Sequence, residues 1–361
     1  MSIEFSPDRW NKIKADARAW WAGELDRPLI QVSLYGRDPG RPEPPIPSHG
    51  FTAFYDDTVP AKAIIDRWDY NLACQQFLGD AFPAVWLNFG PGVIAAFLGA
   101  TLKKSVSTGT VWFQPEQEQE IKDLQFSYNP ENRWFRRIHD ICRAGLERWQ
   151  GQAQMGMTDL GGNLDILSSF RPSEKLLLDL YDHPAEVKRL TWEAHACWWR
   201  YFEAFNSLLQ PVNPGHTAWT PLYSERSYYM LQCDFCYMIG PKMFDEFVKP
   251  ELQASCRRLG NAFYHLDGPG QLPHLDSLLS IPELKGVQWV PGAGQPDMEH
   301  WPEVYRKIRD AGKLIQIWGN FATLDALTEQ LGSAKGICLI TSDTLAHEKE
   351  VLADLRRYGA I

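Results

Sequence analysis

The 361-residue chain lacks the patterns that mark secreted and membrane proteins. Its seven cysteines are an odd number scattered along the sequence, which is typical of a reduced protein rather than of a disulfide framework. Its longest apolar run, residues 92–100, is too short to span a bilayer. The amino-terminal residues have no apolar segment like that of a signal peptide. We therefore expect a soluble cytoplasmic protein that does not enter a membrane.

Dense basic clusters are also missing. The net charge is −9, and the nearest approach to a cluster, "RWFRR" at residues 133–137, fits the solvated face of a helix. A nucleic-acid groove needs a basic stripe, so we expect no nucleic acid as a partner and a small molecule as the substrate. No glycine-rich dinucleotide or phosphate loop follows the first predicted strand, which argues against a doubly wound sheet.

A regular alternation of strands and helices is present. After a predicted amino-terminal helix within residues 1–27, apolar runs of strand length alternate with helical stretches about every 20 to 30 residues. The expected strands are 28–34, 84–89, 152–158, 216–221, 262–267, 287–292, 314–319 and 338–343. Eight such units predict a single α/β domain over residues 1–361, a (β/α)8 TIM-type barrel with an amino-terminal helical extension.

Polar and aromatic side chains gather where these strands end. In a barrel of this kind the active site lies at the carboxyl ends of the strands. We interpret three carboxylates there as acid–base or orienting groups, Asp159, Glu225 and Asp267. Four further residues are predicted to contact substrate, as pocket walls or polar partners: Trp219, Trp289, Trp318 and Asn320.

The stretch "FYHLDGPGQ" suggests a metal site. His265 and Asp267 are two apart on a strand, so their side chains point to the same face. Both residue types bind zinc, and a third ligand is expected from Cys233 in the nearby "CDFC" loop. The alternatives are a simple hydrogen-bonded His–Asp pair and small buried cysteines.

Four segments together carry a family resemblance: "MIGPKMFDEFVKPEL", "AFYHLDG", "GVQWVPG" and "IQIWGNF". They resemble the uroporphyrinogen decarboxylase superfamily, which includes methylcobamide-dependent methyltransferases. The likeness is strongest from about Tyr229 to the end of the chain, and weaker but colinear from Pro28. It implies a (β/α)8 barrel. In the methyltransferase branch it implies zinc bound by a His-x-Cys pair and a further cysteine, with a methylcorrinoid as methyl donor.

This chain departs from both branches of that superfamily. It keeps the histidine as His265 but has Asp267 and Ser342 where the methyltransferases have cysteines. Asp267 favours a harder, more Lewis-acidic centre that holds zinc or another divalent metal. The arginine-rich motif of the decarboxylases is absent, although Arg37 and Arg41 lie in the corresponding place.

Three functions remain open from the sequence. The first is a methyl-group transferase with a metal centre, a methylcorrinoid co-substrate and a corrinoid protein or a second copy of the chain as candidate partners. The second is another small-molecule enzyme on the same barrel, either decarboxylase-like or a carbohydrate lyase or hydrolase with Asp267 and Glu225 as the acid and base. The third is a barrel that binds a small molecule or corrinoid without chemistry.

Overall fold

A computed structural model describes residues 3–105 and 107–361. Its main sheet contains seven strands in the order β2-β1-β11-β10-β9-β8-β7, and two further pairs lie apart from it, β3-β6 and β4-β5. The strands are β1 (Leu29–Tyr35), β2 (Gln75–Gly79), β3 (Ala84–Trp86), β4 (Thr101–Ser105), β5 (Thr110–Gln114), β6 (Gln154–Gly156), β7 (Tyr228–Leu231), β8 (Asn261–Asp267), β9 (Leu284–Val290), β10 (Leu314–Trp318) and β11 (Ile337–Thr344).

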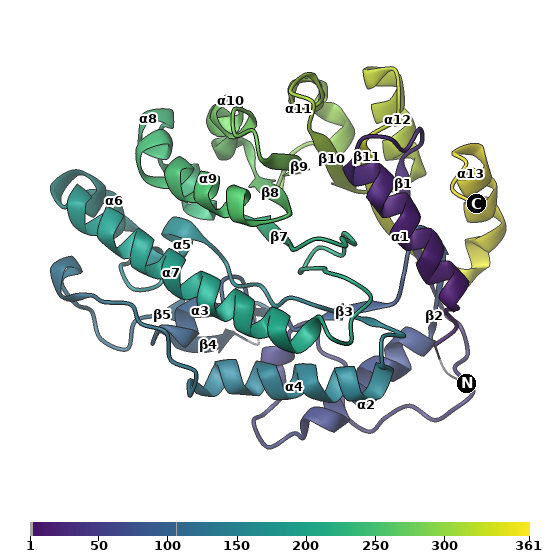
Figure 1. Cartoon of the computed structure of the whole chain (residues 1–361), viewed down its shortest axis with the longest axis horizontal. Helices are drawn as coiled ribbons and strands as arrows, with labels where there is room; N and C mark the ends of the chain where they lie inside the picture. The colour runs from purple at the N-terminus through teal and green to yellow at the C-terminus, as the bar shows by residue number, and fades with distance from the viewer. Residues whose placement is uncertain (1–2, 106) are drawn as a thin grey trace.

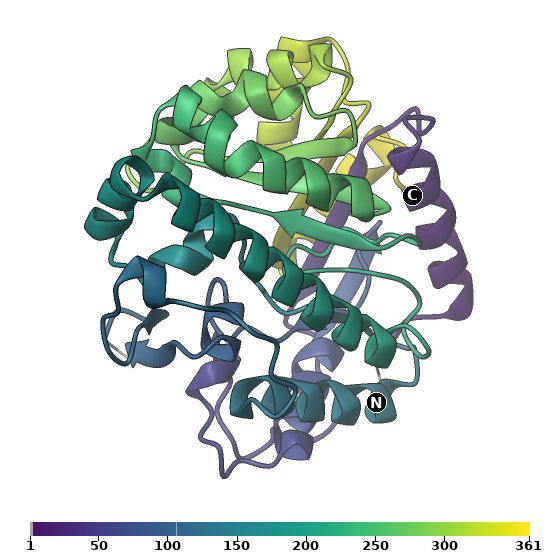
Figure 2. The same ribbon diagram turned by 60° about the vertical axis from the view of Figure 1, so that its left-hand side comes forward.

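Helices surround these strands (Figures 1 and 2). The α-helices are α1 (Pro7–Trp21), α2 (Ala61–Ala73), α3 (Ile94–Phe97), α4 (Arg133–Trp149), α5 (Asn163–Ser168), α6 (Ser173–Asp182), α7 (Pro184–Leu209), α8 (Pro241–Met243), α9 (Lys249–Arg258), α10 (Leu275–Leu279), α11 (Pro302–Asp310), α12 (Phe321–Leu331) and α13 (Glu348–Arg357). A π-helical segment, Phe244–Val248, joins α8 to α9, and the 3₁₀ helix Asp234–Met238 (η3) follows β7.

The parallel α/β character of the chain is confirmed. β1, β11, β10, β9, β8 and β7 run parallel in the main sheet, and β3 pairs in parallel with β6. The antiparallel strand β2 occupies the far edge. Within residues 3–105 and 107–361 no ladder joins the β3-β6 pair to the main sheet, so the structure does not confirm a closed barrel.

The fourth expected strand, residues 216–221, is wrong. This segment makes only an isolated bridge between His216 and Ser224, and the strand that takes its place is β7, which is not among the expected strands. Pro214 precedes the segment and Pro221 ends it, and proline cannot donate to a ladder. The segment still lies beside β6, where the Met157 amide donates to the Thr217 carbonyl at 2.9 Å.

The amino-terminal helix α1 covers the amino-end side of the main sheet. It begins as expected, with Ser6 accepting from the Arg9 amide and proline in its first turn. At its other end, Trp20 stacks on Phe263 at 6.0 Å and Trp21 packs against Tyr228 at 5.8 Å. Both partners lie early in their strands, so α1 leaves the carboxyl ends of β7 and β8 free for a site.

Candidate metal centre

Strand β8 presents His265 and Asp267 on one face. Leu266 between them is fully buried, whereas their side chains are 15% and 42% exposed, as alternation along a strand requires. The His265 Nε2 atom lies 4.0 Å from Asp267 Oδ2, which is too far for a hydrogen bond. The pair therefore retains capacity to bind something between the two groups.

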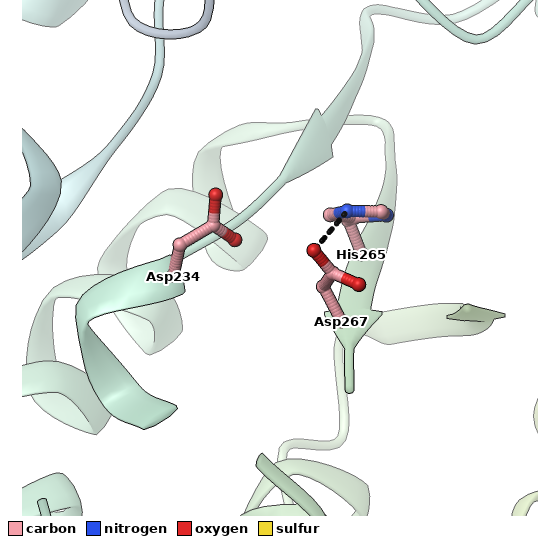
Figure 3. Close-up of side chains that lie close together, drawn as sticks. All are labelled: Asp234, His265 and Asp267. Atoms are coloured by element: carbon pink, nitrogen blue, oxygen red, sulfur yellow. Dashed lines mark ion pairs between the residues drawn. The ribbon is translucent and has the colours of Figure 1, made fainter. Parts of the chain in front are cut away.

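Asp234 completes a cluster of three ligand groups. It is the first residue of η3, and its carboxylate points toward His265 and Asp267 across the gap shown in Figure 3. One ligand atom from each residue lies within 4.8 Å of the other two. Two ligands on one zinc ion are at most about 4.3 Å apart, since each bond is about 2.0–2.2 Å long. A small side-chain rotation would therefore close the set around an ion.

The electrostatics of Asp234 suit a cation. Its side chain is open to solvent but lies in a recess, where burial raises the pKa of the carboxyl. The electrostatic interaction with His265 lowers that pKa, and the nearby Asp267 raises it. A bound cation would offset the repulsion between the two carboxylates.

Asp165 on α5 holds the turn that carries Asp234. The backbone amides of Asp234 and Phe235 donate to its two carboxylate oxygens at 2.9 and 2.8 Å. Burial raises the pKa of Asp165 well above its usual range, and the charge of Asp234 adds to this rise. The turn is thereby fixed by a group from outside its own element.

Two glutamines orient the imidazole. His265 Nδ1 hydrogen-bonds Gln288 Oε1, and Gln288 Nε2 donates to Gln316 Oε1. Because the Gln288 oxygen accepts, Nδ1 carries the proton, and Nε2 keeps its lone pair on the side of Asp267. Metal-binding histidines are commonly held by such a hydrogen bond from the other ring nitrogen. The donor set of one imidazole and two carboxylates thus fits a divalent ion with open positions for substrate.

Cavities adjoin the cluster on two sides. Asp234 lines the larger, of about 640 Å³, together with Asp165, Glu116 and Trp112. Trp219 and Trp318 line the smaller, of about 290 Å³. Trp219 also meets His265 edge to face, with ring centroids 5.2 Å apart. We call these the acidic cavity and the tryptophan cavity.

The third ligand is therefore not the one expected. Cys233 is fully buried and lies outside the cluster of ligand atoms, which Asp234 joins instead. Cys233 contacts Cys236, and burial raises the pKa of its thiol well above the usual range. The reason is local: β7 ends at Leu231, and consecutive residues at the start of the turn point in different directions, with the cysteine toward the core.

Glu225 is displaced from the expected site. It precedes β7 rather than following a strand, and it forms a two-point ion pair with Arg18 of α1, with distances of 2.8 and 2.7 Å. It therefore lies at the amino end of β7, on the opposite side from Asp267, because the strand at 216–221 did not form. An acid–base pair of Asp267 and Glu225, as a carbohydrate-active enzyme would need, is contradicted by this placement.

Two predicted substrate contacts have structural roles. Trp289 is fully buried and packs against Trp301 in the helix layer, since its neighbour Gln288 takes the inward direction. Asn320 caps helix α12, where its side chain accepts from the Thr323 amide at 3.0 Å. Trp219 and Trp318, by contrast, both line the tryptophan cavity.

Asp159 lies close to the centre but is engaged with the backbone. Its Oδ1 accepts from the Gly161 amide at 2.8 Å and from the Tyr229 hydroxyl at 3.3 Å. Burial raises the pKa of this carboxyl to about 7, with a contribution from the charge of Asp234.

Three residues of the site escaped the sequence reasoning: Asp165, Asp234 and Gln288. Asp234 lies inside "CDFC", where Cys233 was the expected ligand, and β7 is not among the expected strands. Gln288 could have been predicted as a site residue, because it is a polar residue in a buried strand, two positions before the strand ends.

Comparison with known proteins places the fold. A methyltransferase from Methanosarcina mazei matches with a TM-score of 0.64 at 11% sequence identity, covering 96% of this chain and 98% of the other. An enolase from the Sargasso Sea environmental genome covers 57% of this chain and 52% of its own at 11% identity, and its TM-score of 0.25 supports no argument. No family profile and no curated protein matches the sequence. No described helix is long and apolar enough to cross a membrane. The chain thus has a methyltransferase-like α/β fold over nearly its whole length.

Proposed function

We propose that this protein is a methyl-group transferase of the corrinoid-dependent kind, with a divalent metal held by Asp234, His265 and Asp267. The observation that carries the proposal is the convergence of these three ligand groups within 4.8 Å, in a fold shared with a methyltransferase. The quoted segments that resemble the uroporphyrinogen decarboxylase superfamily support it independently. Zinc is the first candidate metal.

A divalent ion bound there would act as a Lewis acid that lowers the pKa of a thiol or hydroxyl of the methyl acceptor. Gln288 would keep the His265 lone pair directed at the ion, and Asp165 would hold Asp234 in place. Asp159, whose pKa is about 7, could take up or release a proton near neutral pH. The proposed co-substrate is a methylcorrinoid, delivered free or by a corrinoid protein, and a homodimer is the assembly to test first.

The decarboxylase alternative is less favoured by the placement of the arginines. Arg37 pairs with Glu4, and Arg41 pairs with Asp69. The charge of each guanidinium is thus already offset by a carboxylate of the protein, which leaves little positive charge for a polyanionic substrate. A barrel that binds a small molecule without chemistry remains the competing function, and activity separates the two.

The test measures the bound metal and the methyl-transfer activity of the same protein preparation. Untagged protein is loaded with Zn²⁺, dialysed, and analysed for metal per chain. Methyl transfer is then followed by the change in corrinoid absorbance with methylcobalamin and a panel of thiols. We expect close to one ion per chain and thiol-dependent demethylation of the corrinoid in the wild type, with both lost in His265→Ala.

His139→Ala is the matched control, because that histidine lies on helix α4, outside the cluster, where it hydrogen-bonds Arg143 and packs against Phe135. It should keep both metal and activity. Metal binding without any methyl transfer would support a binding protein and overturn the transferase. Equal metal content in His265→Ala and the wild type would overturn the proposed centre.

A further inference from the structure

The tryptophan cavity differs in chemistry from the rest of the centre. The described residues that line it include no aspartate, glutamate, lysine, arginine or histidine. Its walls are aromatic over much of their extent, with Trp86, Trp219 and Trp318 joined by Tyr35 and Phe77. Such walls favour a flat ring, which gains dispersion and edge-to-face contacts without pairing a charge.

Its volume limits the ligand to one small ring. About 290 Å³ is at the low end for a ligand pocket, below what a drug-sized molecule fills. Trp219 joins the cavity to the metal cluster, because its indole lines the cavity and packs edge to face on the His265 ring, with ring centroids 5.2 Å apart. A ligand held here would therefore lie beside the proposed metal rather than at a distant site.

Two lining groups have polar atoms without a partner. The Trp219 Nε1 and Thr217 Oγ1 atoms are buried and make no hydrogen bond. Thr217 is only 4% exposed, so its hydroxyl lacks water as well. If either side chain turns toward the cavity, its unpaired donor would come within reach of an acceptor atom on a ligand, and binding would be tightened by the new hydrogen bond. An indole N–H can only donate, so the ligand needs an acceptor, and an ammonium group offers none.

We propose that the tryptophan cavity is the subsite for a neutral, single-ring aromatic molecule bearing an acceptor oxygen. As a reactant subsite it rests on the proposed transferase function, because a transferase must hold a donor and an acceptor. A carboxylate ligand is disfavoured because no cation lines the cavity to pair with it. Of the carboxylates of the proposed centre, Asp234 lines the acidic cavity and neither Asp234 nor Asp267 lines the tryptophan cavity.

The test is a binding measurement that needs neither metal nor methyl donor. Phenol, benzoate and benzylammonium are titrated by calorimetry into metal-free and Zn²⁺-loaded protein. We expect phenol to bind both forms at least tenfold more tightly than either charged ring. Trp219→Phe, which keeps a ring but removes the indole N–H, should weaken phenol binding about fivefold to tenfold.

Thr217→Val, nearly equal in shape, provides a second variant and should weaken phenol binding about twofold to fivefold. The matched control is Trp112→Phe, because Trp112 is 59% exposed and lines the acidic cavity instead. It should bind phenol as the wild type does. Benzylammonium or benzoate binding as tightly as phenol overturns the proposal, as does an equal loss in Trp219→Phe and Trp112→Phe. Phenol binding in a protein without methyl transfer would sink the transferase and leave the subsite standing.

Discussion

Two histidine–carboxylate pairs in this molecule illustrate how the same chemistry serves structure or function. His195 on α7 lies 2.7 Å from Glu251 on α9, and Glu251 also accepts from Ser255 and Asn163 at 2.7 and 2.8 Å. That pair is buried in the helix layer, with side chains 14% and 10% exposed. His265 and Asp267 stand 4.0 Å apart at a strand end, and a third carboxylate faces them.

The difference lies in unused ligand capacity. Glu251 has both oxygens engaged by protein donors, so it has nothing to offer an ion. Nε2 of His265 and the carboxylates of Asp234 and Asp267 converge without hydrogen-bonding one another. Satisfied polar networks stabilise a fold, whereas convergent groups that are held apart are arranged to bind. The comparison predicts that removing a member of each pair has opposite consequences for stability and for metal binding.

The largest effect is expected from Asp267→Ala. Structural zinc sites bind with about 10–16 kcal/mol shared among few ligands, so losing one should weaken Zn²⁺ binding about a thousandfold. The free energy of unfolding of the metal-free protein should change by less than about 1 kcal/mol, because Asp267 is partly exposed and makes no close pair. Calorimetric Zn²⁺ titration and urea denaturation measure the two quantities. Strong destabilisation without loss of Zn²⁺ binding would mean that Asp267 has a structural role and is not a metal ligand.

The second largest effect is expected from Glu251→Ala. It leaves His195 and Asn163 without their partner in the helix layer, and we expect a loss of about 3 kcal/mol in the free energy of unfolding by urea denaturation. Glu203→Ala is the matched control, because Glu203 joins the same two helices through an exposed pair with Arg258. It should cost less than about 1 kcal/mol. Equal losses in the two variants would mean that the buried network is not special.

A third prediction concerns the two glutamine side chains that hold the His265 ring. Gln288→Met removes the acceptor for Nδ1 and should weaken Zn²⁺ binding by about 10- to 100-fold, the usual cost of losing such a support. Gln316→Met acts one step further away and should cost less. Calorimetric Zn²⁺ titration of both variants measures the two losses of affinity. A larger effect at Gln316 than at Gln288 would contradict the proposal that Gln288 contacts His265 directly and that Gln316 acts through Gln288.

The sequence predicted the strand that carries His265 and Asp267, because alternation and a following glycine–proline break define it locally. It could not supply Asp234 or separate Glu225 from the site. Both depend on whether the chain forms a strand before or after "PLYSER", which proline placement and long-range pairing with β8 decide. The His195–Glu251 pair has no sequence pattern at all, since 56 residues separate its members and only packing of α7 on α9 joins them.

The last expected effect depends on pH and concerns Asp159, whose burial contrasts with the openness of Asp267. Burial raises its pKa to about 7, while an unfolded aspartate titrates near 3.9. Between about pH 4 and pH 7 the folded state therefore binds more protons than the unfolded state, so this residue's contribution to stability falls as pH rises through that window. Asp159→Asn cannot ionise, yet its side-chain oxygen can still accept from Gly161 and Tyr229. Relative to the wild type, the variant should gain at most about 4 kcal/mol in the free energy of unfolding between pH 4 and pH 8, the equivalent of a shift of about three pKa units. Asp140→Asn, at an exposed position on α4, should show no such trend. Urea denaturation at both pH values decides the matter, and a variant that loses relative stability as pH rises would show that Asp159 is held as a charged, stabilising carboxylate.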